Sequence, residues 1–501
     1  MATLTETIAT GRQVEGHRPW PRFIVDAGTW NAVAARLADG HSALAGLWGA
    51  TDGVHMAVVD PGDKVLAVVS LECPRGTFPS VGRVHPPAIR LERTIADLFG
   101  LLPEGAPDAR PWLDHGRWGV RHPQGRRADA AGAPTDYPFL AAEGESLHQI
   151  SVGPVHAGII EPGHFRFTAN GETVVRLEER LGYVHKGIEA LAAGADIAHA
   201  AKLAGRTSGD STVAYALAYA RAVEAALSVA VPPRAVWLRA LMAELERLAN
   251  HFGDVGAVCN DAAFTLAHAH FGVLREIVLR AAADCFGHRL MRDCVVPGGV
   301  AIEFDGDRAA RVRALIKELG ERFPALVELY DNTASVKDRT FGTGILSQAL
   351  ARKFGAGGFV GRASGRDVDA RRWPGYPPYD ELEFKVPVLS TGDVNARVWV
   401  RIQEIGESLS LIGQILDRLP AGAMLAEIPA GHGEGLGLVE GFRGDVLVWL
   451  RLAGGRIERC HLRDPSWFQW PLLEAVIEGN IVADFPLCNK SFNCSYSGHD
   501  L

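Results

Sequence analysis

The stretch FRFTANGETVVRL, residues 165–177, marks the point where the character of the chain changes. Apolar and polar residues alternate on both sides of Asn170-Gly171, and an Asn-Gly pair between alternating runs is a strong hairpin signal. We therefore predict strands near 165–167 and 173–177. After them, Ala/Leu-rich segments predict helices at roughly 180–194, 196–204, 209–230, 233–259, 263–288, 307–331 and 397–418.

A second hairpin is predicted from 446–452 and 456–460, on either side of Gly454-Gly455. Before the first hairpin the pattern is different, because short strand-like runs mix with helical segments. Strands are predicted at 23–25 and 65–69, and helices at 29–37 and 91–100, the first of them capped near Asp26 or Thr29.

These patterns divide the chain into three parts. Residues 20–115 predict a small α+β domain, and residues 116–147, rich in Arg, Gly, Pro and Ala without periodicity, predict a linker. Residues 148–501 predict a mainly α large domain with small antiparallel sheets.

Composition excludes several classes of protein. The 501-residue chain carries a formal net charge of −8, which argues against nucleic-acid binding. No run of about 18 apolar residues suggests a membrane span, and the N-terminal segment lacks the apolar core of a signal peptide. The seven cysteines are scattered and form no CxxC pair, which favours a reducing cytosol over a disulfide framework. Any membrane role is therefore expected to come through partners.

Short motifs then give the chain a family resemblance. Residues 92–110 contain Glu92-Arg93, Asp97-Leu98-Phe99-Gly100 and Pro107-Asp108-Ala109-Arg110, and this part resembles the 30-kDa-type subunit of respiratory complex I. The large part is similar to the 49-kDa-type subunit of complex I and to the large subunit of group 4 [NiFe] hydrogenases, above all the hydrogenase-4 component G type. The matching segments are GPVH (153–156), EPGHFR (161–166), GYVHKGIE (182–189), VPPR (231–234), PGG (297–299), GRASG (361–365) and EGFRG (440–444).

The resemblance also shows what is missing. Two CxxC pairs hold the metals in the hydrogenases, and their positions match Ser208, Ser211, Ser495 and Gly498 here. A serine hydroxyl does not ionise near neutral pH and is a poor ligand for soft metals, so we expect no nickel–iron centre. Cys488 and Cys494 lie nearby, either as a relocated metal site or as two core thiols.

Complex I implies a second chemistry for this fold, a quinone headgroup held by a histidine and a tyrosine. His164, or alternatively His156, matches the histidine, while Gly209 stands where the tyrosine would be. Asp261 matches the aspartate that orients the histidine. We therefore predict His164 and Asp261 as the catalytic pair, with Asp261 raising the histidine pKa. The predicted cofactor-binding residues are His156, Glu161, His185, Arg206, Glu440 and Arg443.

Several ionisable residues allow two interpretations. Glu244 is expected to lie on an exposed helix face and pair with Arg247, whereas Glu246 has no such partner and stays open. Glu440 and Arg443 either form a buried pair beside the cavity or a salt bridge at the end of a hairpin. Residues 467–470, with two tryptophans, are expected in the core or at a subunit interface.

The resemblance implies a subunit of a membrane-bound oxidoreductase related to hydrogenase-4 and complex I. It would sit peripherally on the cytoplasmic face of the inner membrane, beside a small Fe–S subunit carrying a [4Fe–4S] cluster and beside antiporter-like and helical membrane-arm subunits. This chain alone would hold no cofactor, and electrons would reach a quinone-like acceptor or drive ion translocation. Candidates for the coupling are Glu161, Glu189, Arg206 and Arg443.

Two alternatives stay open. In one, the chain is a true [NiFe] hydrogenase with an unusual metal site. In the other, it is a structural or coupling scaffold without redox chemistry.

Overall fold

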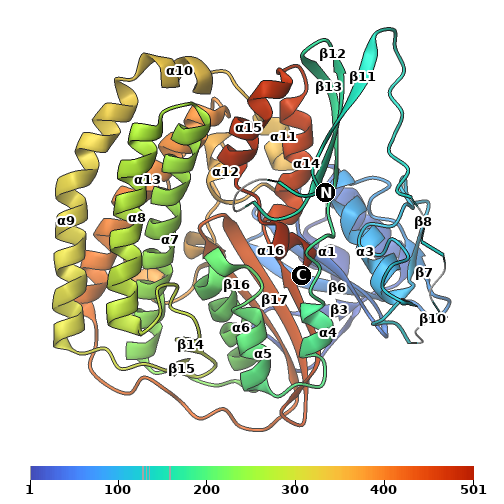
Figure 1. Cartoon of the computed structure of the whole chain (residues 1–501). Coiled ribbons are helices and arrows are strands. Elements are labelled where there is room, and N and C mark those ends of the chain that lie inside the picture. The colour runs from blue at the N-terminus through green and yellow to red at the C-terminus, as the bar shows by residue number, and fades with distance from the viewer. Residues whose placement is uncertain (1, 127–128, 131–132, 135, 157–159) are drawn as a thin grey trace.

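The computed structural model describes residues 2–126, 129–130, 133–134, 136–156 and 160–501. Some residues of the predicted linker, 127–128, 131–132 and 135, therefore lie outside the described part. Figure 1 shows a small mixed α/β part beside a larger, mainly helical part with small sheets, which confirms the predicted fold class.

The small part is built on a five-stranded sheet of order β1-β3-β6-β5-β4. The sheet carries helix α2, which begins after Asp26 because the Asp26 carboxylate accepts a hydrogen bond from Thr29 N at 2.7 Å. Helix α3 ends at Gly100, whose φ of 69° suits glycine. The elements are α1 Leu4–Ile8, β1 Arg12–Gln13, β3 Arg22–Ile24, α2 Ala27–Ala38, β4 Ala43–Ala50, β5 Gly53–Asp60, β6 Val65–Glu72, β7 Thr77–Pro79, η1 Pro86–Ala88, α3 Ile89–Phe99 and β8 Leu102–Glu104.

The predicted first hairpin is present. Strands β12 (His164–Asn170) and β13 (Thr173–Arg180) are antiparallel, and β11 (Leu147–Val152) adds a third strand at the edge. The helix predicted at 180–194 is wrong for most of its length. Only α4 (Ile188–Ala192) is helical there, because Gly182 and Gly187 take positive φ angles of 92° and 70° that interrupt a right-handed helix.

Four long helices form a bundle on the left of Figure 1: α7 (Pro233–Asp261), α8 (Thr265–Phe286), α9 (Gly306–Asp331) and α13 (Val394–Arg418). All four were expected from the sequence. Within the described residues, no helix combines the length and the apolar character that crossing a membrane requires.

The second sheet, of order β18-β17-β16-β2, joins the two parts of the molecule. Helix α6 (Thr212–Leu227) lies directly on β16, where a Cβ on Gly435 would stand 1.9 Å from the Ala222 carbonyl oxygen. The alternate glycines of β16 therefore permit this close approach. The strands are β2 His17–Arg18, β16 Gly433–Gly441, β17 Gly444–Ala453 and β18 Arg456–Arg463.

The opposite face of this sheet packs on the small domain. Leu436, Leu438 and Trp449 form one buried cluster with Trp48 of β4, and β2 pairs in parallel with β16. The division into 20–115, 116–147 and 148–501 stays a proposal. Strand β2 lies just before the first of these ranges and belongs to the second sheet.

The C-terminal helices lie buried above the sheet. Tyr496 to Leu501 are all less than one tenth exposed, and Trp467 and Trp470 are buried, as expected for a core position. The remaining elements are β9 Val120–Arg121, β10 Asp129–Ala130, α5 Ile197–Ala204, η2 Gly209–Ser211, β14 Val295–Val296, β15 Gly299–Val300, α10 Ala334–Thr340, α11 Gln348–Lys353, α12 Gly358–Ala363, η3 Arg371–Gly375, η4 Tyr379–Glu381, α14 Ser466–Ile477, η5 Val482–Asp484, α15 Phe485–Phe492 and α16 Tyr496–Asp500.

Candidate functional site

The two motifs that carry the replaced cysteine positions meet in one cavity of about 350 Å³. Ser208 precedes η2, Ser495 caps α16, and their hydroxyl oxygens lie 2.9 Å apart although 287 residues separate them. We call this the serine cavity. It is lined by Ile160, Glu161, Ser208, Gly209, Asp210, Arg443, Asn489, Lys490, Asn493, Cys494, Ser495, Tyr496 and Ser497.

An ion pair stands in the wall of the serine cavity. Arg443 donates from Nη1 and Nη2 to the Asp210 carboxylate at 2.7 and 2.5 Å, and Ser208 donates to the same carboxylate at 2.9 Å. Burial raises the pKa of Asp210, but Arg443 outweighs it and holds that pKa below its usual value. The cavity therefore presents a paired cation and hydroxyl groups.

The residues of the serine cavity do not fit a nickel–iron centre. Such a centre needs converging thiolates, and here the Ser495 hydroxyl accepts a hydrogen bond from Gly498 N at 2.9 Å. A Cβ on Gly498 would lie 2.4 Å from Oδ2 of Asp464, and Tyr215 donates to that same oxygen. The fourth ligand position is thus closed by a carboxylate. No cluster of three or more metal-binding side chains occurs in the described residues.

The two nearby cysteines do not replace the missing ligands. Burial raises the pKa of Cys488 to about 12 and holds that of Cys494 well above its usual value, so both are thiols near neutral pH. Cys494 lies 4.0 Å from Gln469 Oε1, whereas Cys488 packs beside Gly344. Their surroundings are those of core thiols.

The predicted pair of His164 and Asp261 is not brought together. His164 begins β12, where its Nδ1 lies 3.3 Å from the Gly153 carbonyl oxygen. Asp261 ends α7 beside Asn260, and Lys490 is the cation that faces it. Neither residue lines the serine cavity, and no contact joins them among the residues that the structure describes.

The expected effect on the histidine is also reversed. Burial, opposed by the Gly153 carbonyl and aided by Arg166, lowers the pKa of His164. The prediction that Asp261 raises this pKa is therefore wrong, because Asp261 is not among the groups that act on the His164 ring. Burial raises the pKa of Asp261 itself.

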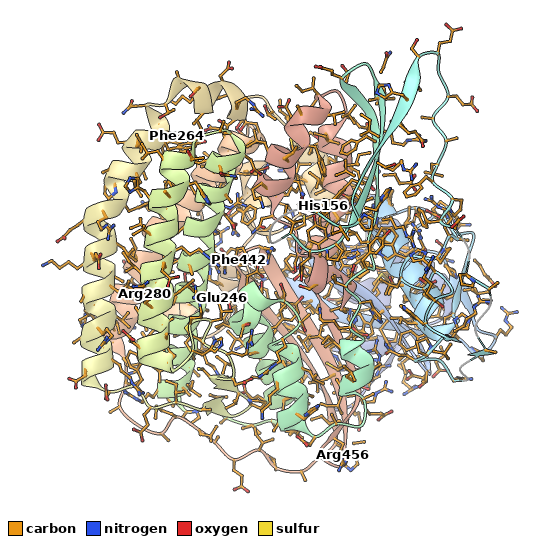
Figure 2. All side chains as sticks on the ribbon, viewed as in Figure 1. His156, Glu246, Phe264, Arg280, Phe442 and Arg456 are labelled. Carbon is orange, nitrogen blue, oxygen red and sulfur yellow. The ribbon has the colours of Figure 1, made fainter. Side chains whose placement is uncertain are left out.

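The other predicted residues have separate places. Glu161 lines the serine cavity and accepts a hydrogen bond from Ser497 N at 3.0 Å. His156, at the base of the hairpin in Figure 2, hydrogen-bonds with the Gly163 carbonyl at 2.8 Å. His185 contacts the Asp500 carbonyl at 2.7 Å. The side chains of these two histidines therefore contact main-chain carbonyl groups.

Arg206 and Glu189 also lie outside the cavity. Arg206 pairs with Asp293 at 2.6 Å on the surface. Glu189 accepts from Arg459 and His461, both at 2.8 Å, in the seam between the small domain and the second sheet. Neither contact supplies a group to the serine cavity.

The expected Glu440–Arg443 pair is wrong, although both residues are buried. The turn between β16 and β17 directs them to different partners. Arg443 pairs with Asp210, whereas Glu440 accepts from Arg362 Nη1 and from Ala370 N, both at 2.9 Å.

Glu244 is fully buried, so its expected exposed position is also wrong. Its pairing with Arg247 is present at 3.4 Å, and Arg371 contacts it at 3.0 Å. Glu246, labelled in Figure 2, accepts hydrogen bonds from Val213 N and Ala214 N. Burial raises the pKa of Glu246 to about 8.

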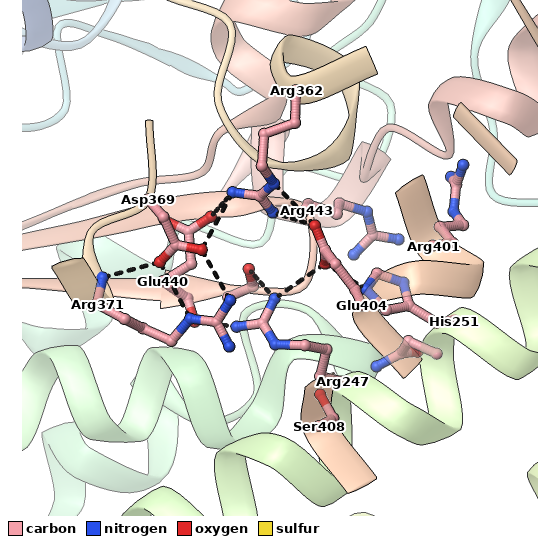
Figure 3. Close-up of polar contacts among 12 residues, drawn as sticks. Arg247, His251, Arg362, Asp369, Arg371, Arg401, Glu404, Ser408, Glu440 and Arg443 are labelled. Atoms are coloured by element: carbon pink, nitrogen blue, oxygen red, sulfur yellow. Dashed lines mark hydrogen bonds and ion pairs between the residues drawn. The ribbon is translucent and has the colours of Figure 1, made fainter. Parts of the chain in front are cut away.

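Figure 3 shows a group of charged residues whose assembly was not predicted from the sequence. Its members come from α7, α12, η3, α13, β16 and the loop before η3. Glu244, Arg247 and His251 share one face of α7 at helical spacing, but no spacing links them to the other members. A further sign was the presence of several acidic and basic residues in strongly apolar segments. The members are Glu244, Arg247, His251, Arg362, Asp369, Arg371, Glu404 and Glu440, and we call them the carboxylate–arginine cluster.

Comparison with known proteins places this chain in a family. Residues 261–432 match the family model of the respiratory-chain NADH dehydrogenase 49 Kd subunit, and residues 23–134 match that of the 30 Kd subunit. The chain is 31% identical to formate hydrogenlyase subunit 5 of Escherichia coli over 86% of this chain and 78% of that protein. It is 31% identical to hydrogenase-4 component G of the same organism, over 84% and 76%.

A solved structure shows a similar fold. A chain of the membrane-bound sulfane sulfur reductase, an archaeal respiratory membrane complex, superposes with a TM-score of 0.67 at 26% identity, over 71% of this chain and 99% of that one. The protein is therefore an oxidoreductase subunit that belongs to the family of hydrogenase-4 component G and the complex I 49-kDa subunit, fused to a complex I 30-kDa-type domain.

Proposed function

We propose that this chain is the large subunit of a membrane-associated oxidoreductase complex and works without a nickel–iron centre of its own. The proposal depends mainly on the fourth ligand position of the hydrogenases, which is occupied by Gly498 in this chain. Gly498 has no side chain, and Asp464 occupies the space that a cysteine there would need. The other three positions carry serine hydroxyls in place of thiolates, and Ser208 and Ser211 contact Asp210.

The serine cavity suits a small polar acceptor such as a quinone headgroup. Arg443, Lys490 and the serine hydroxyls offer hydrogen-bond donors, and oxygens of a reduced acceptor gain negative charge. Donors fixed in advance stabilise charge that develops during a reaction. Glu161 lies in the same wall and is the candidate to deliver a proton.

The electron donor in this proposal is a [4Fe–4S] cluster on a small partner subunit. Antiporter-like and helical membrane-arm subunits would hold the assembly on the cytoplasmic face of the inner membrane. The support is the membership of relatives in hydrogenase, NADH-quinone oxidoreductase and respiratory membrane complexes. His164 and Asp261 do not line the cavity, so the role that we propose for them is outside it. His164 would act from the base of the hairpin and Asp261 from the end of α7.

The test uses the intact complex, purified with its partner subunits. Nickel and iron are measured together with acid-labile sulfide, and electron transfer is followed to a quinone analogue and to polysulfide, because the solved relative reduces sulfane sulfur. We expect no nickel, and iron that matches the sulfide. Stoichiometric nickel would overturn the proposal in favour of a true hydrogenase.

Three variants separate a working cavity from a redox-inactive scaffold. Arg443→Met removes the cavity cation and should lower kcat by about tenfold or more, since one such donor contributes about 100-fold or more in other enzymes. His164→Ala, outside the cavity, should have a smaller effect. Arg280→Met, on the exposed face of α8 in Figure 2, is the matched control and should leave turnover unchanged. Equal turnover in all three variants would favour the scaffold.

A further inference from the structure

The carboxylate–arginine cluster is closed to solvent. Each of its eight side chains belongs to a residue no more than 4% exposed. Charged groups are stable in such a place only when they are paired and hydrogen-bonded. The pairing within the cluster is therefore the feature that decides its charge.

Arg362 is the centre of the cluster. Its Nη2 lies 2.6 Å from Glu404, and its Nη1 lies 2.9 Å from Glu440 and 3.4 Å from Asp369. Two carboxylates thus converge on one nitrogen atom. Two like charges that share one cation repel each other, which favours a proton on one of the two carboxylates.

The charge count within the cluster agrees with this. Four carboxylates face three guanidinium groups, so full ionisation of these seven groups leaves one negative charge in excess. Outside the cluster, Arg366 and Asp445 also face Glu440, and they carry opposite charges. His251 does not offset the excess, because burial lowers the pKa of this ring. Its Nε2 lies 2.7 Å from Glu404, and its Nδ1 has no hydrogen-bond partner among the described residues.

Glu440 is the carboxylate most favoured to hold the proton. Burial, followed by the charge of Asp369, raises the pKa of Glu440 to about 7, although Arg362 opposes this. The pKa of Asp369 stays near 2, because Arg371 and Arg362 outweigh its burial. The charged and titratable groups that face Glu440 are Arg247 on α7, Arg362 on α12, Arg366, Asp369 and Tyr376 between α12 and η4, and Asp445 on β17. Arg371 on η3 acts on Asp369.

The cluster reaches the surface on one side. Tyr379 donates its hydroxyl to Glu244 at 2.7 Å, and Arg371 contacts both Glu244 and Asp369. Tyr379 and Arg371 also line an open surface pocket of about 850 Å³. Tyr379 and Arg371, itself a member of the cluster, therefore lie between this pocket and the carboxylates of Glu244 and Asp369.

On the other side the cluster is tied to the serine cavity. Glu440 and Arg443 lie three residues apart on the β16–β17 turn, and Arg443 holds Asp210 in the cavity wall. Arg247 of the cluster donates to the backbone carbonyl oxygens of Glu440 and Gly441 at 2.9 and 3.2 Å. The β16–β17 turn is therefore the segment of chain that joins the cluster to the cavity.

We propose that Asp369 and Glu440 form a proton-binding site that exchanges one proton with water on the Tyr379 side and is coupled through the β16–β17 turn to the serine cavity. The proton passes between water and a Glu440 carboxylate oxygen, and no electron moves in this step. Negative charge that arrives in the cavity favours proton uptake by the pair. Only the origin of that charge rests on the proposed function.

The first test compares thermal unfolding of the complex at several pH values. A carboxyl group whose pKa rises on folding stabilises the folded state fully below its unfolded pKa, and this contribution is lost as the pH rises through the folded pKa. The Tm of the wild type should therefore fall between about pH 5 and pH 8 by more than that of Glu440→Gln, which cannot ionise.

Two further variants keep this test decisive. Glu381→Gln changes an exposed carboxylate that pairs with Arg418, and its Tm should keep the wild-type slope. Glu404→Gln removes a carboxylate whose pKa Arg362 and His251 hold well below its usual value despite burial, so it should lower the Tm at every pH. A Glu440→Gln complex with the wild-type slope, or with the loss seen in Glu404→Gln, would overturn the proton-binding site.

The second test is infrared difference spectroscopy on reducing the complex with dithionite. A carboxylic-acid C=O band should appear in the wild type and be absent in Glu440→Gln. The band in both would reject Glu440 as the proton acceptor. If the pH slope depends on Glu440 but no acceptor is reduced, the proton-binding site stands and the proposed function fails.

Discussion

The serine cavity and the carboxylate–arginine cluster lie at the two ends of one turn, yet they are built on different principles. The cavity is open, and its hydroxyl groups form ordinary hydrogen bonds that water can replace. The cluster is buried, and each carboxylate in it contacts at least one arginine. Replacing a hydroxyl group in the cavity should therefore change the free energy of unfolding little, whereas the charges of the cluster depend on one another.

The largest expected effect comes from breaking the cluster at its centre. Arg362→Met leaves Glu404, Glu440 and Asp369 without their shared guanidinium and should destabilise the chain by about 3–5 kcal/mol. Denaturant unfolding of the complex measures it. Arg372→Met is the matched control, because this arginine pairs with Asp367 in solvent and should cost almost nothing. Similar values for both arginines would remove the distinction between cluster and surface.

An apolar reference shows whether the cluster is unusual or only buried. Phe99 fills the seam between the small domain and the second sheet, where a Cβ on Gly49 would lie 2.7 Å from its ring and Arg459 lies over it. Phe99→Ala should cost about 3–5 kcal/mol through the cavity it leaves. The effect should be independent of pH, and unchanged stability would show that the seam does not depend on Phe99.

Restoring the lost ligands one at a time tests the cavity. Ser208→Cys should cost about 1 kcal/mol or less, from weakened hydrogen bonds. Gly498→Cys should cost about 1–3 kcal/mol, because its side chain collides with Asp464. Thermal unfolding of the single variants gives the order, and the variant with all four cysteines is expected to bind no nickel. Equal tolerance of both single changes would contradict the closed ligand position.

The smallest effect on stability is expected at Gly209. Nothing lies within 4 Å of a Cβ built there, so Gly209→Tyr should change stability by no more than about 0.5 kcal/mol. It would supply the phenol that the complex I resemblance lacks at this position. Reduction of a quinone analogue should rise about tenfold or more over Gly209→Phe, which adds the same ring without the proton donor. Equal rates would speak against quinone in the cavity.

Periodic features of the sequence predicted most of the fold. The hairpin at Asn170-Gly171 and the long helices such as α7 follow from local spacing. Strand β16 was missed, because alternate glycines in residues 433–437 are typical of a loop. In the structure they allow α6 to lie close against the strand. The helix expected at 180–194 failed because local Ala and Leu content does not report the φ angles of Gly182 and Gly187.

The site was less predictable than the fold. The convergence of Ser208 and Ser495 followed from the family motifs, but their partners Asp210 and Asp464 did not. The His164–Asp261 pair was inferred from matching positions, but in the structure each of the two residues contacts other partners. Side-chain partners far apart in the chain, such as Arg362 and Glu440, leave no periodic trace in a single sequence.

The pairing of β2 with β16 has a consequence for how the chain is made. His17 and Arg18 leave the ribosome near the start of synthesis, but their partners Glu434 and Gly435 emerge more than 400 residues later. Arg22 contacts Glu434 at 2.6 Å, and it too is synthesised long before its partner. Contacts between such distant segments form late and slow folding. A chain that stops before β16 therefore lacks the partners of β2 and Arg22, which leaves this face open to chaperones and proteases.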